Sequence, residues 1–218
     1  MDPGIIASLV FFALLVGFIV LTGIITSGAP KRRTRALEAV AAEMGFFFVA
    51  DKPNFLEDLH LPGTLLIWTR WARNFMEGTV SGMRTVIFDC YTRSTVVAFA
   101  STQRRVPAFD LSRKPLLQPN SSYSNLVELS APEFSRRFAL IGVDHNWLRR
   151  MFDRQVIDLI VSSYARRSFR LNGGGPWLVF VAQQRRIKPA KWQGFLQDMS
   201  QIASAVFERA RAEDTAAA

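Results

Sequence analysis

An uncharged stretch near the N-terminus constrains this chain more than any other feature. No charged side chain occurs between Asp2 and Lys31, and the run from Ile5 to Ile25 is almost entirely apolar. A helix rises about 1.5 Å per residue, so about twenty residues cross the roughly 30 Å hydrocarbon core of a bilayer. Four cations follow at once, Lys31, Arg32, Arg33 and Arg35. The pattern predicts a transmembrane anchor over residues 1–30.

The charges beside this segment predict its orientation. A cleaved secretory signal has a basic start and an apolar stretch of about 7–15 residues, whereas this chain begins Met1-Asp2-Pro3 and its apolar run is longer. The positive-inside rule then places residues 31–218 in the cytoplasm. A single cysteine, Cys90, fits a reducing compartment and leaves no internal disulfide. We expect a single-pass protein of the inner (cytoplasmic) membrane with its N-terminus outside.

Two sets of residues are candidates for contacts in and at the membrane. Small residues four apart, Ala13 with Gly17 and Gly23 with Ser27, can seat a neighbouring helix, although such residues also occur in helices that pack against nothing. Lys31, Arg32, Arg33 and Arg35 are placed to contact anionic lipid headgroups.

Charge also restricts the partners of the rest of the chain. Residues 31–218 contain all 27 Lys and Arg and all but one of the 18 acidic residues, so they carry a net charge of +10. Anionic headgroups and an acidic surface of another protein both fit such a domain. No helix-turn-helix, zinc-finger or aromatic RNA-binding pattern is present, so we do not expect nucleic acid as a partner.

The remaining chain predicts one cytoplasmic α+β domain, residues 31–210, with a flexible tail over 211–218. Short helices are expected at 35–44, ended by Gly45, and after the caps Ser130 and Asp144, with a break near Asp153. The clearest helix follows Pro189, where an apolar stripe from Trp192 to Phe207 indicates core packing.

Strands are expected at 46–49, 65–68, 72–77, 83–91, 95–99 and 137–141, and at 168–171 and 177–182 around a glycine turn. The strand at 83–91 alternates enough to predict one buried and one more polar sheet face. Residues 101–125 contain three prolines and predict a long irregular connection.

No catalytic or metal-binding constellation stands out. The two histidines, His60 and His145, lie far apart in the sequence, and Gly173-Gly174-Gly175 lacks the Gly-Lys-Ser/Thr sequence of a phosphate loop. Asp89 lies within an apolar strand, where an ion pair with an arginine is a better interpretation than catalysis. An enzyme with an unfamiliar site that joins Asp89, Cys90 and His145 stays an alternative. We expect no catalytic, cofactor or metal site.

One block resembles an uncharacterised family of bacterial single-pass membrane proteins. The block is Arg73-Asn74-x3-Gly78-x3-Gly82-x5-Phe88-Asp89-Cys90-Tyr91, and the family pattern reads RN…G…G…FDYxY. A later PxF segment matches Pro107-Ala108-Phe109, and further matches are Pro132 to Phe138 and Arg186 to Pro189. This chain departs from the pattern at Cys90, where tyrosine is usual, and in a shorter turn after Tyr91. The resemblance implies an N-terminal anchor and a cytoplasmic domain, with structural roles for the matched residues and no established activity.

Together these observations predict an α+β fold in which one transmembrane helix precedes a mainly antiparallel sheet covered by helices. The function that they favour is a non-enzymatic accessory subunit of a membrane-protein complex, for example an energy-converting respiratory or photosynthetic assembly or an export complex. The alternative is a membrane-tethered module that binds anionic lipid or a small ligand.

Overall fold

The computed structural model describes residues 31–51, 72–90, 94–115, 123–182 and 186–216. Eight strands form one sheet in the order β1-β2-β3-β4-β8-β7-β5-β6, and all pairings between neighbouring strands are antiparallel. The strands are β1 (Phe47–Val49), β2 (Arg73–Val80), β3 (Met83–Asp89), β4 (Thr95–Ala100), β5 (Val106–Arg113), β6 (Phe138–Gly142), β7 (Phe169–Gly175) and β8 (Trp177–Ala182). This confirms the predicted α+β class with a mainly antiparallel sheet.

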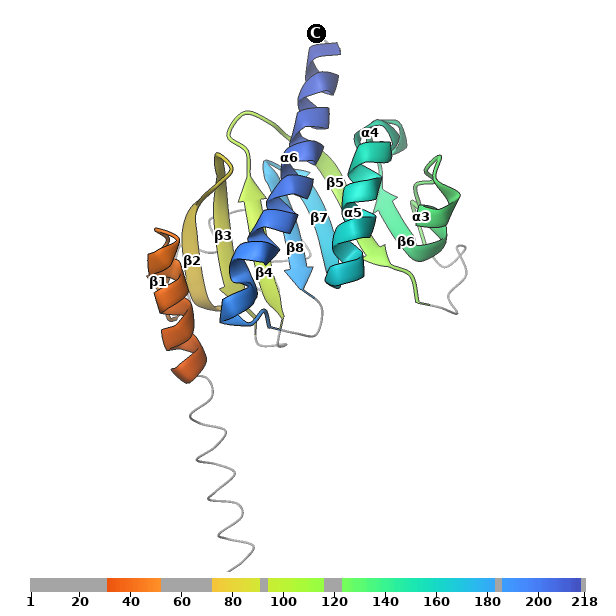
Figure 1. Cartoon of the computed structure of the whole chain (residues 1–218). Helices are drawn as coiled ribbons and strands as arrows, with labels where there is room; N and C mark the ends of the chain where they lie inside the picture. Colours follow the sequence, from red (N-terminus) through yellow and green to blue (C-terminus); the bar gives the residue numbers. More distant parts are fainter. Residues whose placement is uncertain (1–30, 52–71, 91–93, 116–122, 183–185, 217–218) are drawn as a thin grey trace, which may run out of the picture.

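Helices cover one face of the sheet (Figure 1). They are the helical segment 31–43, α3 (Pro132–Arg137), α4 (His145–Met151), α5 (Arg154–Arg166) and α6 (Trp192–Ala216), which a single 3-10 turn, η4 (Pro189–Lys191), precedes. Among the described residues, none of these helices is both long and apolar enough to cross a membrane. The predicted anchor, residues 1–30, lies outside the described part of the chain, as does the predicted strand 65–68.

The core between helices and sheet contains the apolar stripe that the sequence placed on the last helix. The stripe residues are all buried: Trp192, Phe195, Leu196, Met199, Ile202, Ala203, Val206 and Phe207. They pack with alternate residues of the central strands, such as Ile87, Val97 and Phe180. Burial of one such side chain contributes about 1.5–3 kcal/mol, so α6 and the sheet stabilise each other. The helix continues to Ala216, beyond the predicted start of the tail.

The expectation of one polar sheet face was wrong. The residues of β3, β4 and β8 that point away from the helices are also buried and apolar, among them Phe88, Val96 and Val179. The polar residues Thr85 and Asp89 lie instead on the helix-covered face, where both are buried. Strands buried on both faces read as apolar runs rather than as an alternation, and β4 and β8 are of this kind.

Residues 101–125 do not form one long irregular connection, because 106–113 make β5. This strand pairs with β7 on one side and β6 on the other. Its proline, Pro107, lies where the register with β7 shifts between Val106 and Phe109, so the missing N–H interrupts no regular ladder. Pro107 therefore concealed a strand that lies next to the edge strand β6.

The predicted hairpin is confirmed, with Gly175 at its turn, but Gly173 and Gly174 belong to its first strand rather than to a loop. β7 continues to Gly175, and only Pro176 separates it from β8. At Gly173 a Cβ atom would lie 2.1 Å from the Phe109 ring, so the absence of a side chain lets that ring pack across the strand. Gly78 has the same function within β2, where the Phe46 ring occupies the space of a Cβ.

The predicted helix boundaries near Gly45, Asp144 and Asp153 are confirmed. Gly45 has a φ of +67°, and the N–H groups of Gly45 and Phe46 donate to the carbonyls of Ala42 and Ala41, the pattern of a Schellman cap. Asp144 and Asp153 accept hydrogen bonds from the N–H groups of Trp147 and Val156. The predicted cap at Ser130 was wrong, since Ala131 precedes α3 and makes no side-chain cap bond.

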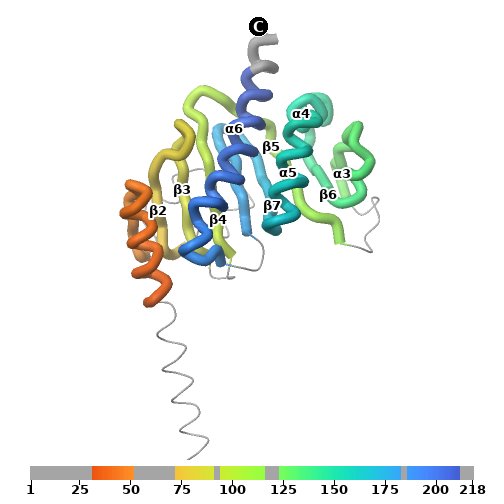
Figure 2. Tube along the Cα trace, in the orientation of Figure 1, coloured from red at the N-terminus to blue at the C-terminus, as the bar shows by residue number. Residues whose placement is uncertain are grey.

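The helices begin and end at different ends of the sheet. The helical segment 31–43 and α6 both begin at the same end, and α6 finishes beyond the other (Figure 2). The chain that precedes residue 31 therefore joins the domain at the end where β3 and β8 finish and β4 begins. We call this the anchor end of the domain, after the anchor that the sequence predicts for residues 1–30.

Candidate functional site

Asp89 lies at the anchor end, at the last position of β3, and is 2% exposed. The Arg33 guanidinium donates two hydrogen bonds to it, from Nε to Oδ2 at 2.7 Å and from Nη2 to Oδ1 at 2.8 Å. The Arg33 side chain is 14% exposed. This confirms the predicted ion pair of Asp89 with an arginine, and its geometry is the two-pronged arrangement that suits guanidinium and carboxylate groups.

The pair belongs to a ring of hydrogen bonds from four segments. The Thr95 hydroxyl donates to Asp89 Oδ1 at 2.8 Å, and the Ile187 N–H donates to the Thr95 hydroxyl at 3.3 Å. Arg33 Nη1 then donates to the Ile187 carbonyl at 2.8 Å and closes the ring. The ring joins the first described helical turn, the end of β3, the start of β4 and the chain that leads into α6.

Asn74 adds the edge of β2 to this ring. Its amide donates to Asp89 Oδ2 at 3.0 Å, and its carbonyl oxygen accepts from the Thr34 hydroxyl at 2.8 Å. Asn74 has a φ of 52°, within a register shift of β2 between Arg73 and Met76. Asparagine adopts this left-handed conformation more readily than most residues. We call Arg33, Thr34, Asn74, Asp89, Thr95 and Ile187 the Asp89 cluster.

The Asp89 cluster has the properties of a clamp rather than of a reactive centre. Arg33, Asn74 and Thr95 together donate four hydrogen bonds to the two carboxylate oxygens. Within the described residues, no three His, Cys, Asp or Glu side chains are grouped so as to hold a metal ion. What the arrangement does is fasten the helix that follows residue 30 to the sheet.

The alternative that Asp89, Cys90 and His145 form one site is excluded by the fold. Cys90 follows β3 at the anchor end, whereas His145 follows β6, five strands away at the opposite end. Burial, reinforced by the negative charge of Asp89 and opposed by Arg186, raises the pKa of the Cys90 thiol to about 12. A thiol with this pKa is protonated at neutral pH and is a poor nucleophile.

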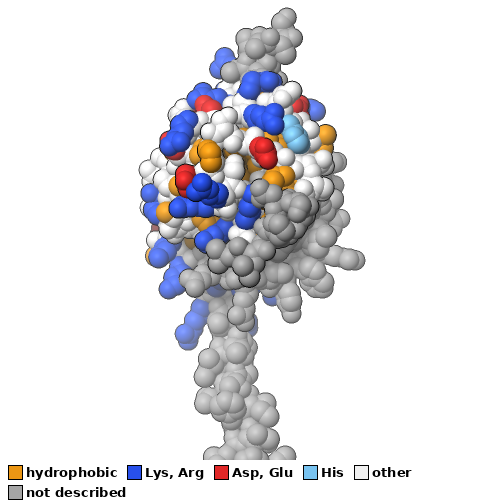
Figure 3. Space-filling model, turned by 90° about the vertical axis from the view of Figure 1, so that its right-hand side faces the viewer, with side chains coloured by type: hydrophobic (Ala, Val, Ile, Leu, Met, Phe, Trp, Pro, Cys, Tyr) orange, Lys and Arg blue, Asp and Glu red, His pale blue; other side chains and the backbone are white. Residues whose placement is uncertain are grey.

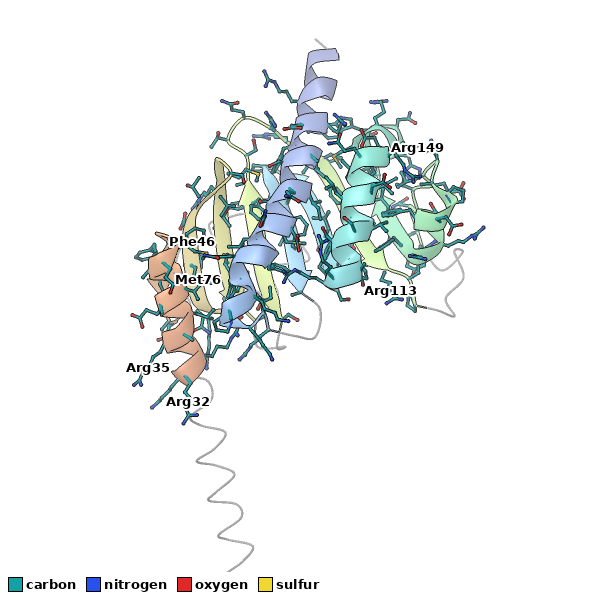
Figure 4. All side chains as sticks on the ribbon, in the orientation of Figure 1. Arg32, Arg35, Phe46, Met76, Arg113 and Arg149 are labelled. Atoms are coloured by element: carbon teal, nitrogen blue, oxygen red, sulfur yellow. The ribbon has the colours of Figure 1, made fainter. Side chains whose placement is uncertain are left out.

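The cations predicted to contact headgroups divide into two groups. Lys31, Arg32 and Arg35 are exposed at the anchor end, where Figure 4 labels Arg32 and Arg35. Arg33 instead turns into the domain and pairs with Asp89, a role that the sequence did not reveal. The predicted helix-packing residues Ala13, Gly17, Gly23 and Ser27 lie outside the described part of the chain.

A polar hollow of about 340 Å³ lies at the end away from residue 31. It is bordered by the β2–β3 turn, the β4–β5 connection and the last turns of α6, and its lining includes Ser81, Gln103, Ser204 and Glu208. A second hollow of about 300 Å³ shares Ser81, Ser204 and Glu208 with it. The lining of the first hollow offers hydroxyl and amide groups together with the charged side chains of Arg104 and Glu208, and it includes none of the Asp89 cluster.

Signals for the Asp89 cluster were partly present in the sequence. The RN…FD block contains both Asn74 and Asp89, and their hydrogen bond explains why the two positions belong to one pattern. Gly82 of the same block has a φ of +75° in the β2–β3 turn. Ile187 lies in the Arg186 to Pro189 match, although nothing there indicated its partners, and nothing local indicated Thr95, which reaches Asp89 through the pairing of β3 and β4.

Comparison with known proteins shows a shared fold. No family model matches the chain, and no curated protein matches it. The crystal structure of the mycobacterial trehalose monomycolate transport factor A, TtfA, is similar, with a TM-score of 0.60 and 18% sequence identity. The similarity covers 79% of this chain and 94% of that one. The domain therefore has the same fold as a transport factor.

Proposed function

We propose that this protein is a non-enzymatic accessory subunit of a membrane-protein complex, of the export kind rather than the energy-converting kind. In this proposal residues 1–30 anchor it in the inner membrane and the α+β domain binds a partner in the cytoplasm. The observation that carries the proposal is the clamp between Arg33 and Asp89, which ties the helix next to the proposed anchor to the sheet.

The clamp matters because it fixes the helical segment 31–43, which in this proposal follows the anchor, to the sheet. A tether that serves only to keep an enzyme near a membrane works with a flexible linker. Here the helical segment 31–43 packs into the core through Leu37 and Ala41 and is fixed by a buried ion pair. Fixed orientation is useful to a protein that must present one surface to a neighbour in the same membrane.

Two further observations support a binding role. The Cys90 thiol is buried with a raised pKa, and Asp89 uses its oxygens in the clamp, so neither is available for chemistry. The fold is shared with a protein named as a trehalose monomycolate transport factor. That likeness favours export over energy conversion as the process that this subunit serves.

The proposal is tested by affinity purification of the full chain from native membranes in mild detergent, followed by mass spectrometry. We expect an integral membrane protein of an export system to co-purify in stoichiometric amount. A protein that runs as a monomer with no specific partner, compared with an unrelated single-pass protein carrying the same tag, would contradict the proposal.

A further inference from the structure

Eight of the exposed basic residues in the described ranges lie at the anchor end, although they come from distant parts of the sequence. Register places them there: Arg73 faces Asp89 across β2 and β3, and Arg113 faces Phe138 at the start of β6. The chain between β8 and α6 contributes two lysines at the same end. The set, which we call the basic end, is Lys31, Arg32, Arg35, Arg73, Arg113, Arg137, Lys188 and Lys191, all of them exposed.

Described acidic residues neutralise little of the basic end. Asp89 is buried in its clamp, Glu133 pairs with Arg136, and Asp198 pairs with Arg166 and Arg167. Asp51 and Glu38, which lies one helical turn after Arg35, are exposed acidic residues at or near this end. None of the eight residues of the basic end forms an ion pair with an acid in the described ranges.

At the opposite end some of the cations have acidic partners. Arg84 pairs with Glu77, Arg154 with Asp158 and Arg209 with Asp153. In Figure 4, Arg32 and Arg35 lie lowest, Arg113 lies above them, and Arg149 lies higher still. Figure 3, seen toward the α3 and β6 edge, shows basic side chains both at the lower end and over the upper end, where acidic side chains lie among them.

The width of the basic end determines what it can bind. Arg73 on β2 and Arg113 on β5 are separated by five strand spacings, which is about 24 Å at roughly 4.8 Å per strand. A single small anion cannot contact both sides of such a surface. An extended array of negative charges can, and a leaflet that contains anionic lipid is such an array.

The length of the connection to the apolar segment limits the distance from the bilayer. Five residues separate Ile25 from Lys31, and even fully extended the six Cα-to-Cα steps between the two span at most about 20 Å. The headgroup layer and a Debye length of about 8 Å at physiological salt take up much of that distance. We infer that the basic end lies on the cytoplasmic leaflet and binds anionic lipid headgroups across its whole width, beyond the juxtamembrane cluster 31–35. The inference rests on the proposed anchor but not on the proposed partner.

The test uses the full chain in nanodiscs and measures the distance from the basic end to the lipid surface. A donor dye is placed on a Cys90→Ala, Gln193→Cys background, because Gln193 is exposed in the first turn of α6, and the acceptor is carried by lipid headgroups. We expect more energy transfer with phosphatidylglycerol than with phosphatidylcholine, and a decrease when salt is raised. The charge-reversal variant Arg113→Glu, Lys188→Glu, Lys191→Glu should lose this dependence on lipid type.

The matched control reverses the same number of charges at the far end, with Arg105→Glu, Arg149→Glu and Arg154→Glu. It should keep the dependence on phosphatidylglycerol. Equal energy transfer with phosphatidylglycerol and phosphatidylcholine would overturn the inference. So would an equal loss of the lipid dependence in the basic-end variant and in the control. Neither result bears on the co-purification of the partner. If the basic-end variant loses its protein partner but keeps the lipid dependence, the surface binds an acidic protein and the lipid assignment is also wrong.

Discussion

Arg33 and Asp89 are 56 residues apart in sequence, and their bidentate ion pair joins the helix that follows residue 30 to the end of β3. Phe46 and Met76, labelled in Figure 4, belong to the same buried core at the other end of this helix–sheet contact. The contact is therefore apolar along its length and ionic at the end where the chain enters the domain.

Removal of the carboxylate should destabilise the domain strongly. Asp89→Asn leaves the Arg33 guanidinium mostly buried without a counter-charge, and loss of one partner of such a pair costs about 3 kcal/mol. For a domain of this size the melting temperature should fall by roughly 6–12 °C. Thermal unfolding of the full chain in detergent, followed by tryptophan fluorescence, measures the effect.

The matched control is Asp158→Asn, which breaks an exposed pair with Arg154 and should change stability by less than about 0.5 kcal/mol. A double-mutant cycle of Arg33→Gln with Asp89→Asn should show coupling of about 1–3 kcal/mol. Additive effects in that cycle would mean that the two residues do not act as a pair.

The clamp should also matter for partner binding if the proposed function is right. Arg33→Gln weakens the attachment of the helical segment 31–43 to the sheet without altering residues 1–30, so the protein should still insert in the membrane. Recovery of the co-purifying partner should drop several-fold. Arg35→Gln, an exposed neighbour with the same loss of charge, should keep recovery near the wild-type level. Equal recovery from both variants would argue against a role of the clamp in orientation.

Gly173→Ala should destabilise the sheet, because its Cβ would overlap the Phe109 ring. We expect a loss of about 1–3 kcal/mol in the free energy of unfolding, the usual cost of overpacking a core. Gly194→Ala is the control, since its Cβ would meet only the tip of Arg167 at 3.1 Å, and alanine favours the helix by up to about 1 kcal/mol. Combining Gly173→Ala with Phe109→Leu should restore part of the loss, and no recovery would disprove the steric explanation.

The Cys90 thiol should react slowly in the folded protein. With a pKa of about 12, the thiolate fraction at pH 8 is roughly a thousandfold below that of an unfolded cysteine. Iodoacetamide labelling at pH 8, with and without denaturant, measures the ratio. Labelling of the native protein at the unfolded rate would show that the thiol is neither buried nor shifted.

The same shift has a consequence for stability at high pH. The folded state keeps the thiol proton to a higher pH than the unfolded state, whose ordinary pKa is 9.0. Between about pH 9 and pH 12 the unfolded state therefore binds fewer protons, and the free energy of unfolding falls by up to about 1.4 kcal/mol per pH unit. Denaturant unfolding of wild type and Cys90→Ala should diverge in this range, because only the wild type carries this contribution. If the free energy of unfolding changed with pH in the same way in both proteins, the shifted pKa of Cys90 would be contradicted.

The sequence alone determined the features that depend on local chemistry. The apolar stripe after Pro189, the Asp144 cap, the break at Asp153 and the Gly45 helix end were read correctly, because helix period and capping act within a few residues. The ion pair of Asp89 with an arginine was also foreseen, since a carboxylate in an apolar strand needs a charged partner.

Tertiary structure alone decided which arginine that was, and which faces of the sheet are buried. Strand β5 was missed because of Pro107 and the prolines that follow the strand. The glycines of β7 predicted a turn. In both places strand pairing and the packing of Phe109 outweigh local propensity. The Asp89 cluster and the basic end have the same origin. Each gathers residues that are far apart in the chain, and only the order and register of the strands bring such residues to one end of a sheet.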